Sequence, residues 1–182
     1  MQHVFVSGNL ALDFLGTRKW RRSEAEELLR TPDDLAAWIA AAGLVPEPVA
    51  VDAAGLDRGV ELREALYRVV AARSRGGAAR SEDLEVVNHA AAAAPPRPVL
   101  EAQGVRWVGD LPAVLSAVAR AGVDAISPGV VELVKECGRE ECTRVFVDRS
   151  RGGRRAWCGM DECGNRVNAA AYRRRRAVAA GR

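Results

Sequence analysis

The chain has 182 residues, of which 48% are hydrophobic and 28% charged, and its formal net charge is +3. This length suits one moderate domain, or one domain with a small module, and the hydrophobic fraction is enough for a folded core. No uncharged apolar run reaches about 18 residues, which excludes a transmembrane helix. The N-terminus lacks a basic region before its apolar residues, which argues against a signal peptide. We therefore expect a cytoplasmic protein without a membrane partner, where clustered cysteines more often bind metal than form disulfides.

Three helices are predicted in the first hundred residues. The segment from Thr31 to Gly43, TPDDLAAWIAAAG, has an N-cap, a proline at the first helical position and a glycine stop. Residues 56–77 have a second amphipathic pattern that ends at a glycine pair. Residues 81–96 have a third, for which Ser81 is the predicted N-cap and a proline pair the predicted end.

Two strand signals and a fourth helix follow. Residues 98–110 alternate between apolar and polar on both sides of Gly104, which predicts a β-hairpin. A helix is predicted to begin near Asp110, and residues 129–137 alternate like a strand that leads into the first cysteine. This part of the chain has no phosphate-binding glycine loop and no catalytic motif, so we do not expect an enzyme.

Positive charge is concentrated at the C-terminal end. Residues 138–182 contain 12 Lys and Arg against 5 Asp and Glu, whereas residues 1–137 contain 15 against 19. A mildly acidic body with a basic tail indicates two tasks in one chain, and the tail suits a polyanionic partner.

All four cysteines also lie at this end, as Cys137, Cys142, Cys158 and Cys163. They form two pairs, each with four residues between its members, and fifteen residues separate the pairs. This spacing suits one tetrahedral zinc ion held by four thiolates. In the insert, TRVFVD is predicted as a strand, RSRGG as a turn and RRAW as the returning strand, and the chain after the last cysteine has helical character. Turn, hairpin and helix in this order are the plan of a treble-clef finger.

A structural zinc site is our main interpretation of the cysteines. A pair of disulfides and a redox-active thiol switch are the alternatives. Catalytic zinc is disfavoured because four protein ligands leave no open position for water. The predicted fold class is therefore mainly α with small β elements: a helical regulatory or assembly domain over residues 1–130, and a treble-clef-like four-cysteine finger with a basic C-terminal helix over residues 131–182.

The finger resembles the CGNR zinc-finger proteins, because CGNR occurs at residues 163–166 after WCGMDE and FVDRSRGGRRAW. The N-terminal GNLALDFLGT resembles the opening motif, close to G-x-x-A-L-D-F-x-N-T, of the ABATE-type domain that precedes the finger in this family. The resemblance implies a helical N-terminal domain, a zinc finger and a role in stress-induced transcription regulation. The chain departs from the family at Gly16, where Asn is usual, and at Ala156, where a basic residue is frequent.

Arginine dominates the basic tail, and its planar guanidinium can bind a phosphate or a guanine edge through two hydrogen bonds. The helix after the last cysteine is the natural element to enter a major groove, while the arginines near Gly152 and Gly153 would hold phosphates. A solvated tail, an acidic protein partner and anionic lipid are the alternatives. The candidate nucleic-acid-binding residues are Arg149, Arg151, Arg154, Arg155, Asn165, Arg166, Arg173, Arg174 and Arg175.

The N-terminal motif supplies a candidate ligand site, in which Asn9, Asp13 and Thr17 would lie beside a small pocket. Its structural alternative is that Asp13 and Thr17 cap or cross-link helices. Together these features predict a DNA-binding transcription regulator whose N-terminal domain senses a small-molecule effector or assembles, for example into a homodimer. The competing hypothesis is a zinc-stabilised RNA- or protein-interaction module without a DNA operator.

Overall fold

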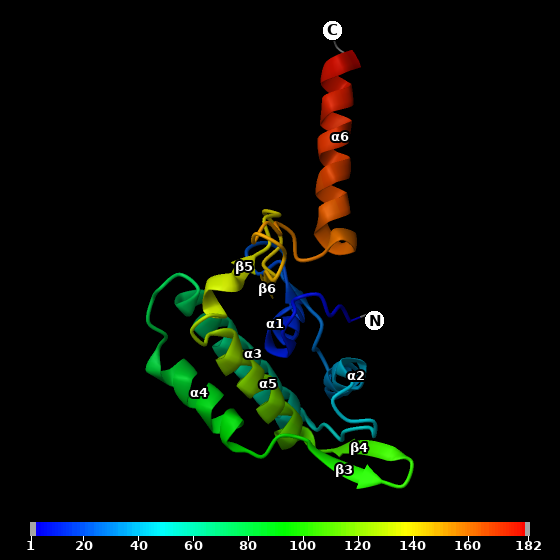
Figure 1. Ribbon diagram of the computed structural model, residues 1–182, viewed down its shortest axis with the longest axis vertical. Coiled ribbons are helices and arrows are strands. Elements are labelled where there is room, and N and C mark those ends of the chain that lie inside the picture. The colour runs from blue at the N-terminus through cyan, green and yellow to red at the C-terminus, as the bar shows by residue number, and fades with distance from the viewer. Residues whose placement is uncertain (1–2, 181–182) are drawn as a thin grey trace.

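The computed structural model describes residues 3–180. Two helices, α3 (Ala53–Arg73) and α5 (Leu111–Ala125), lie side by side in the helical part of the molecule (Figure 1). Helix α4 (Ser81–Ala92) packs against both on one side, and the short helix α1 (Leu10–Leu15) packs against both on the other. The described helices include none that is both long enough and apolar enough to cross a membrane.

The hydrophobic core forms where α1 meets its neighbours. Leu12 and Phe14 of α1 are completely buried, and the Phe14 ring lies 4.7 Å from the ring of Trp38. Trp38 belongs to α2 (Pro32–Ala42), which packs against α3. The predicted boundaries of α2 are confirmed: Thr31 caps its first turn, and Gly43 ends it with a φ of 66° that a residue with a Cβ rarely adopts.

Within residues 3–180, six short strands form three antiparallel pairs. They are β1 (Arg18–Lys19) with β2 (Glu26–Glu27), β3 (Arg97–Glu101) with β4 (Gly104–Val108), and β5 (Val134–Glu136) with β6 (Val145–Val147). The second pair is the predicted hairpin, which projects from one end of the helices (Figure 1). The third pair buries Val134, Val145 and Val147 in the same core as the helices, so the residues after 130 are packed onto the helical domain.

Helix α6 (Asn165–Ala180) follows a π-helical turn, Met160–Gly164, and extends away from the rest of the molecule (Figure 1). The predicted helix after Cys163 is therefore confirmed. Its length of 16 residues corresponds to about 24 Å at 1.5 Å per residue.

Three local predictions are wrong. Residues 154–157 form no strand, because β6 pairs with the preceding β5 instead of with a returning strand in the insert. Residues 131–133 form a 3₁₀ turn, so the strand that leads to the first cysteine begins only at Val134. Ser81 is the first residue of α4 and not its N-cap. The preceding Arg80 makes no capping hydrogen bond and instead donates to Asp83.

Asp83 fixes the start of α4 against α3. Its carboxylate is nearly buried and accepts hydrogen bonds from Arg68 of α3, at 2.6 and 2.8 Å, and from Arg80, at 2.9 and 3.2 Å. The Arg68 hydrogen bonds, helped by Arg80 and opposed by burial, lower the pKa of Asp83 to about 2. The charged form is therefore the one that holds the two helices together.

Replacing Asp83 with Asn should lower the free energy of unfolding at pH 7 by about 2 kcal/mol, because charge-assisted hydrogen bonds are lost from a buried site. A carboxyl whose pKa is depressed on folding stabilises above its ordinary pKa and loses that contribution as pH falls through the folded value. The difference between the two proteins should thus shrink between about pH 4 and pH 2 in urea unfolding.

Asp57→Asn is the matched control, because Asp57 is exposed on α3 and has no partner among the described residues. It should change stability by less than about 0.5 kcal/mol. A difference between wild type and Asp83→Asn that persists unchanged at pH 2 would contradict this role of the carboxylate.

Candidate metal centre and nucleic-acid interface

The four cysteine thiols converge at the base of α6. Cys137 follows β5, Cys142 ends the turn before β6, and Cys163 lies in the π-helical turn. All four are buried, their sulfur atoms lie within 4.8 Å of one another, and Cys142 Sγ is 3.9 Å from Cys158 Sγ. The sequence prediction that these residues come together is confirmed.

These distances suit a single tetrahedral zinc ion. Zinc–sulfur bonds of about 2.3 Å require sulfur atoms about 3.8 Å apart. Without a cation, the site disfavours the thiolate form of its cysteines. Burial and repulsion from Cys142 and Cys137 raise the pKa of the Cys163 thiol to about 12. The hydrogen bond that the Cys158 thiol makes to Cys142, together with burial and the charge of the other sulfurs, likewise raises the pKa of Cys158. Four thiolates can share this volume only when a metal ion compensates their charge, and the site is a structural zinc site.

Backbone hydrogen bonds build the two turns that carry the ligands. The N–H of Cys142 donates to the carbonyl of Arg139 at 2.9 Å, which closes the first turn, and the N–H of Cys163 donates to Gly159 at 3.0 Å. Gly138 allows the turns to approach, since its N–H donates to Ala156 and an added Cβ would lie 3.1 Å from that carbonyl oxygen. A small core of Phe146 and Trp157 supports the cluster.

Arg155 braces the finger from within. Its guanidinium donates to the carbonyl of Trp157 at 2.9 Å, to that of Val6 at 2.6 Å and to that of Cys158, and it stacks 4.3 Å from the Phe146 ring centroid. The sequence suggested a phosphate contact for this residue. In the structure its hydrogen-bonding groups are directed into the protein, so we leave Arg155 out of the proposed DNA contacts.

The N-terminal arm, residues 4–7, joins the finger to the helical domain. On the finger side, the N–H of Val147 in β6 donates to the carbonyl of Ser7 at 2.8 Å. Arg144, a buried residue beside the second cysteine, donates to the carbonyl of Val4 at 3.0 Å. The same stretch of backbone also accepts the Arg155 hydrogen bond at Val6.

On the helical side, Asp13 of α1 holds the same arm. One carboxylate oxygen accepts the N–H groups of Val6 at 2.9 Å and Ser7 at 2.8 Å. Burial raises the pKa of Asp13, although these hydrogen bonds and the charge of Arg144 favour the ionised form. Asp13 therefore has a structural task that connects the two parts of the chain.

Asn9 and Thr17 also have structural partners. The Asn9 side chain caps α1 and donates to the carbonyl of Ala121 in α5 at 2.9 Å. The Thr17 hydroxyl donates to Phe14 at 2.7 Å and accepts from the buried Arg63 at 3.1 Å. The cavity that Thr17 and Asp13 line has about 10 Å³, the space of about one water molecule. Ligand binding by these three motif residues stays a prediction.

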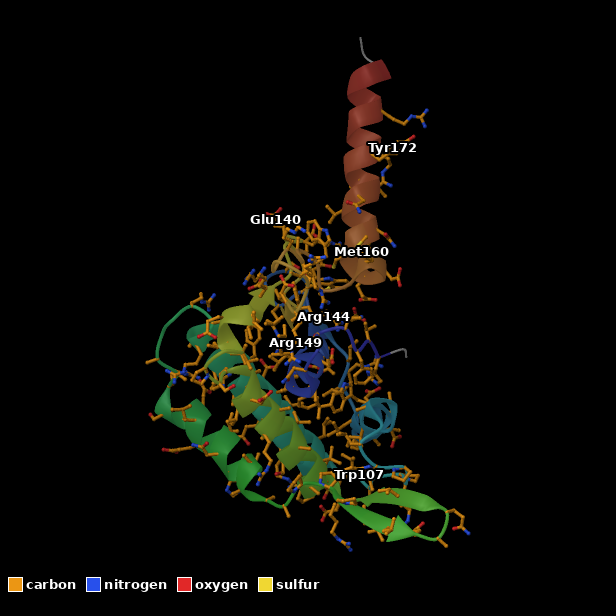
Figure 2. The ribbon with its side chains drawn as sticks, in the orientation of Figure 1. Trp107, Glu140, Arg144, Arg149, Met160 and Tyr172 are labelled. Carbon is orange, nitrogen blue, oxygen red and sulfur yellow. The ribbon has the colours of Figure 1, made fainter. Side chains whose placement is uncertain are left out.

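The candidate nucleic-acid-binding residues lie in two places. Arg149, Arg151 and Arg154 are exposed on the loop between β6 and Cys158, with Arg149 near the junction with the helical domain (Figure 2). Asn165, Arg166 and Arg173 are exposed on α6, and the Asn165 side chain donates to Asp161 at 3.2 Å. The side chains of Arg174 and Arg175 lie outside the described residues.

Arg166 and Arg173 share one face of α6, as their spacing predicted. Both line a groove of about 720 Å³ between this helix and the first cysteine turn. The opposite wall contains Arg139 and Trp157, which sequence reasoning did not select. Arg139 could have been found, because it lies between the first two cysteines and so had to be close to the metal. Trp157 adjoins the third ligand in the same way.

Fold and site together define a helical domain joined to a four-cysteine zinc finger. The family described as "Putative stress-induced transcription regulator" matches residues 8–129, and the CGNR zinc finger matches residues 134–176. The first match covers more than half of the chain, which therefore belongs to this regulator family and carries its zinc finger. No curated protein matches the sequence significantly.

Replacing Cys158 with Ser should release the zinc ion and unfold the two turns that carry the ligands, because their own core of one phenylalanine and one tryptophan cannot hold them. We expect metal analysis to fall from one zinc per chain to near zero, while circular dichroism keeps the signal of the helical domain. Treatment of the wild type with a chelator should produce the same state. Added zinc should restore the wild type but not the variant. Full zinc occupancy in the variant would refute the four-cysteine site.

Replacing Arg155 with Met keeps an apolar stem beside Phe146 but removes the hydrogen bonds to three carbonyls. Loss of such contacts next to metal ligands should weaken zinc binding by about 10- to 100-fold in competition with a chelator. Arg154→Met is the control, since Arg154 is exposed and its side chain has no partner among the described residues, and its zinc affinity should equal that of the wild type. If Arg155→Met and Arg154→Met change the zinc affinity equally, the hydrogen bonds of Arg155 do not support the zinc site.

Proposed function

We propose that this protein regulates transcription by binding duplex DNA through the finger and α6, while the N-terminal domain senses a ligand or mediates assembly. The observation that carries the proposal is the difference in how the two parts use their arginines. In the helical domain they mostly neutralise carboxylates, whereas most of the finger arginines whose side chains the structure describes are left free for a partner.

The arginines of the helical domain are largely paired. Arg63, which is completely buried, forms two hydrogen bonds of 2.6 Å with Glu27, and Arg21 contacts Glu64 at 2.6 Å. In the finger, by contrast, six exposed arginine side chains have no hydrogen bond or ion pair with any residue in the range 3–180. They are Arg149, Arg151, Arg154, Arg166, Arg173 and Arg176, the last of which lies over the Tyr172 ring.

Helix α6 has the size and position that a major groove requires. It extends away from the protein, with Tyr172 about half-way along it (Figure 2), and an α-helix fits the groove width of about 12 Å. Arg166 and Arg173 on one face can approach base edges or phosphates, and the loop arginines can hold the adjacent backbone. Duplex DNA is favoured over single strands because the finger exposes few aromatic rings for stacking, Tyr172 among them.

Binding, and not catalysis, is the activity that we propose for the finger. The four thiolates complete the tetrahedral coordination of zinc, which leaves no position for a reactive water molecule. The metal would therefore shape the DNA-binding surface by fixing the start of α6 through Cys163.

The affinity for duplex DNA should depend steeply on salt. About five to seven phosphate contacts would give a slope of roughly −5 to −6 in a plot of log affinity against log salt concentration. Arg151→Ala and Arg154→Ala should each make the slope about one unit shallower and weaken binding to all sequences alike, as measured by fluorescence anisotropy with labelled duplexes.

Arg75→Ala is the matched control, because it removes one exposed arginine from a loop of the helical domain that lies outside the finger. Its slope should equal that of the wild type. If the wild-type affinity does not depend on salt, or if all three variants change the slope equally, the finger is not the DNA-binding surface.

A further inference from the structure

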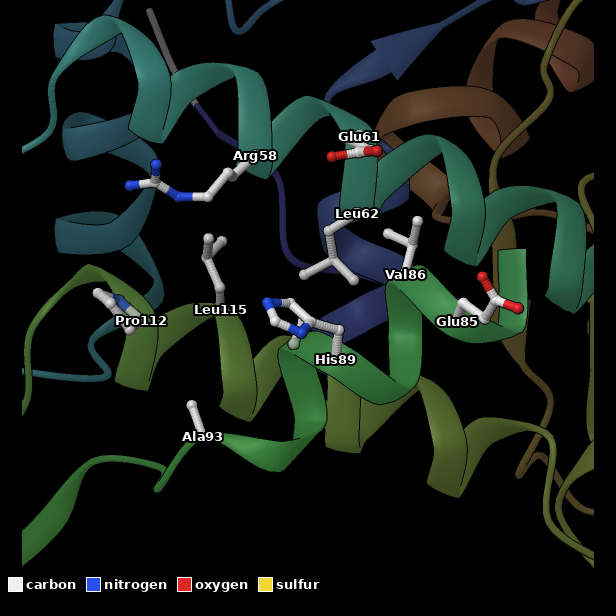
Figure 3. Close-up of a pocket in the computed structure, with 10 residues that line it drawn as sticks. Arg58, Glu61, Leu62, Glu85, Val86, His89, Ala93, Pro112 and Leu115 are labelled. Atoms are coloured by element: carbon white, nitrogen blue, oxygen red, sulfur yellow. The ribbon is translucent and has the colours of Figure 1, made fainter. Parts of the chain in front are cut away.

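A cavity of about 520 Å³ lies between α3, α4 and α5. Leu62 of α3 and Leu115 of α5 form its apolar floor, and Val86 of α4 and Pro112 of α5 complete its walls (Figure 3). This volume lies within the range of about 300–1,000 Å³ that is typical of small-molecule sites. It is far larger than the space beside Thr17 and Asp13.

The sequence of α4 explains why the cavity exists. The end of the helix and the residues after it, 90–94, are all alanine, and Ala90 and Ala93 face the cavity. Only Asp83 and Val87 of this helix are buried. Alanine side chains are too short to fill the space between α3 and α5, although filling it with larger apolar residues would add stability.

Ionisable side chains surround the opening. Arg58 and Glu61 come from α3, and Glu85 and His89 from α4. All four are exposed, and none has a hydrogen bond or ion pair with a residue that the structure describes. Figure 3 shows the His89 ring beside Leu62 and Leu115, Arg58 at one end of the cavity, Glu85 at the other end and Glu61 between them along one edge.

We propose that this cavity binds a small amphipathic amine. The apolar part of the ligand packs on Leu62, Val86 and Leu115, and its ammonium group lies near Glu61 and Glu85. Two carboxylates against one guanidinium give the opening a negative balance, which favours a cation over an anion. The polar groups at the mouth fix the orientation of the ligand, while the burial of its apolar part supplies most of the affinity.

If the N-terminal domain senses a ligand, this cavity is where we expect the ligand to bind. The role of the ligand in regulation rests on the proposed function, whereas its binding to the cavity does not. Binding to the cavity is measured without DNA. A failure of the cavity proposal is therefore distinct from a failure of DNA binding.

The test uses three probes with the same apolar body and different head groups: 4-phenylbutylamine, 4-phenylbutanol and 4-phenylbutyrate. Isothermal titration calorimetry on the zinc-loaded full chain should show that all three probes bind. The dissociation constant of the amine should be roughly tenfold lower than that of the carboxylate. The alcohol should lie between them. No binding of any probe, or tighter binding of the carboxylate, would overturn the proposal.

Two variants separate the floor from the opening. Glu61→Gln combined with Glu85→Gln should abolish the preference for the amine and leave alcohol binding unchanged, because it removes charge but not volume. Ala90→Leu combined with Ala93→Leu should weaken all three probes at least tenfold by filling the cavity. Ala92→Leu is the control on the same helix, since Ala92 is exposed and does not line the cavity.

Unfolding of the leucine variant would be detected by circular dichroism. The test then rests on the glutamine variant, whose changed side chains are exposed and unpaired. Retention of the amine preference in the glutamine variant would contradict the assigned head-group position. Unchanged binding to a folded leucine variant would show that the probes bind elsewhere.

Discussion

The hydrogen bonds between Asp13 and the backbone of Val6 and Ser7 fix the arm on which the two parts of the protein meet. Because one carboxylate oxygen accepts both N–H groups, the carbonyls of the arm remain free to face the finger. Arg144 and Arg155 then donate to two of these carbonyls. The finger is thus attached through main-chain groups of a short segment, and its orientation depends on a buried carboxyl group in α1.

This attachment connects the metal site with the helical domain. Arg155 bonds both the arm and the carbonyl of Cys158, so an element of the N-terminal region contributes to the support of a zinc ligand. The strands β5 and β6 contribute in turn to the helical core through Val134, Val145 and Val147. Helix α1, which packs against α3 and α5, therefore also contacts the strand that leads from the second cysteine, β6.

Much of this arrangement follows from local sequence signals. Caps and stops identified α2 and α5, Gly104 lies at the hairpin, and the cysteine spacing located the metal site. The failures concern long-range contacts. Nothing in the local pattern of residues 154–157 reveals that β6 prefers β5 as its partner, and nothing near Arg155 reveals its bond to Val6. The cavity escaped prediction for the same reason, because an alanine run shows missing volume only when α3 and α5 are in place.

The central claim is that the zinc-loaded finger recognises DNA in the cell's own genome. Its most direct test is the enrichment of genomic fragments bound by the zinc-loaded protein, compared with the same protein after zinc removal and refolding without metal. The account predicts that a recurrent sequence is enriched only by the zinc-loaded form. Equal recovery of all fragments by both forms, or no recovery of DNA at all, would contradict it.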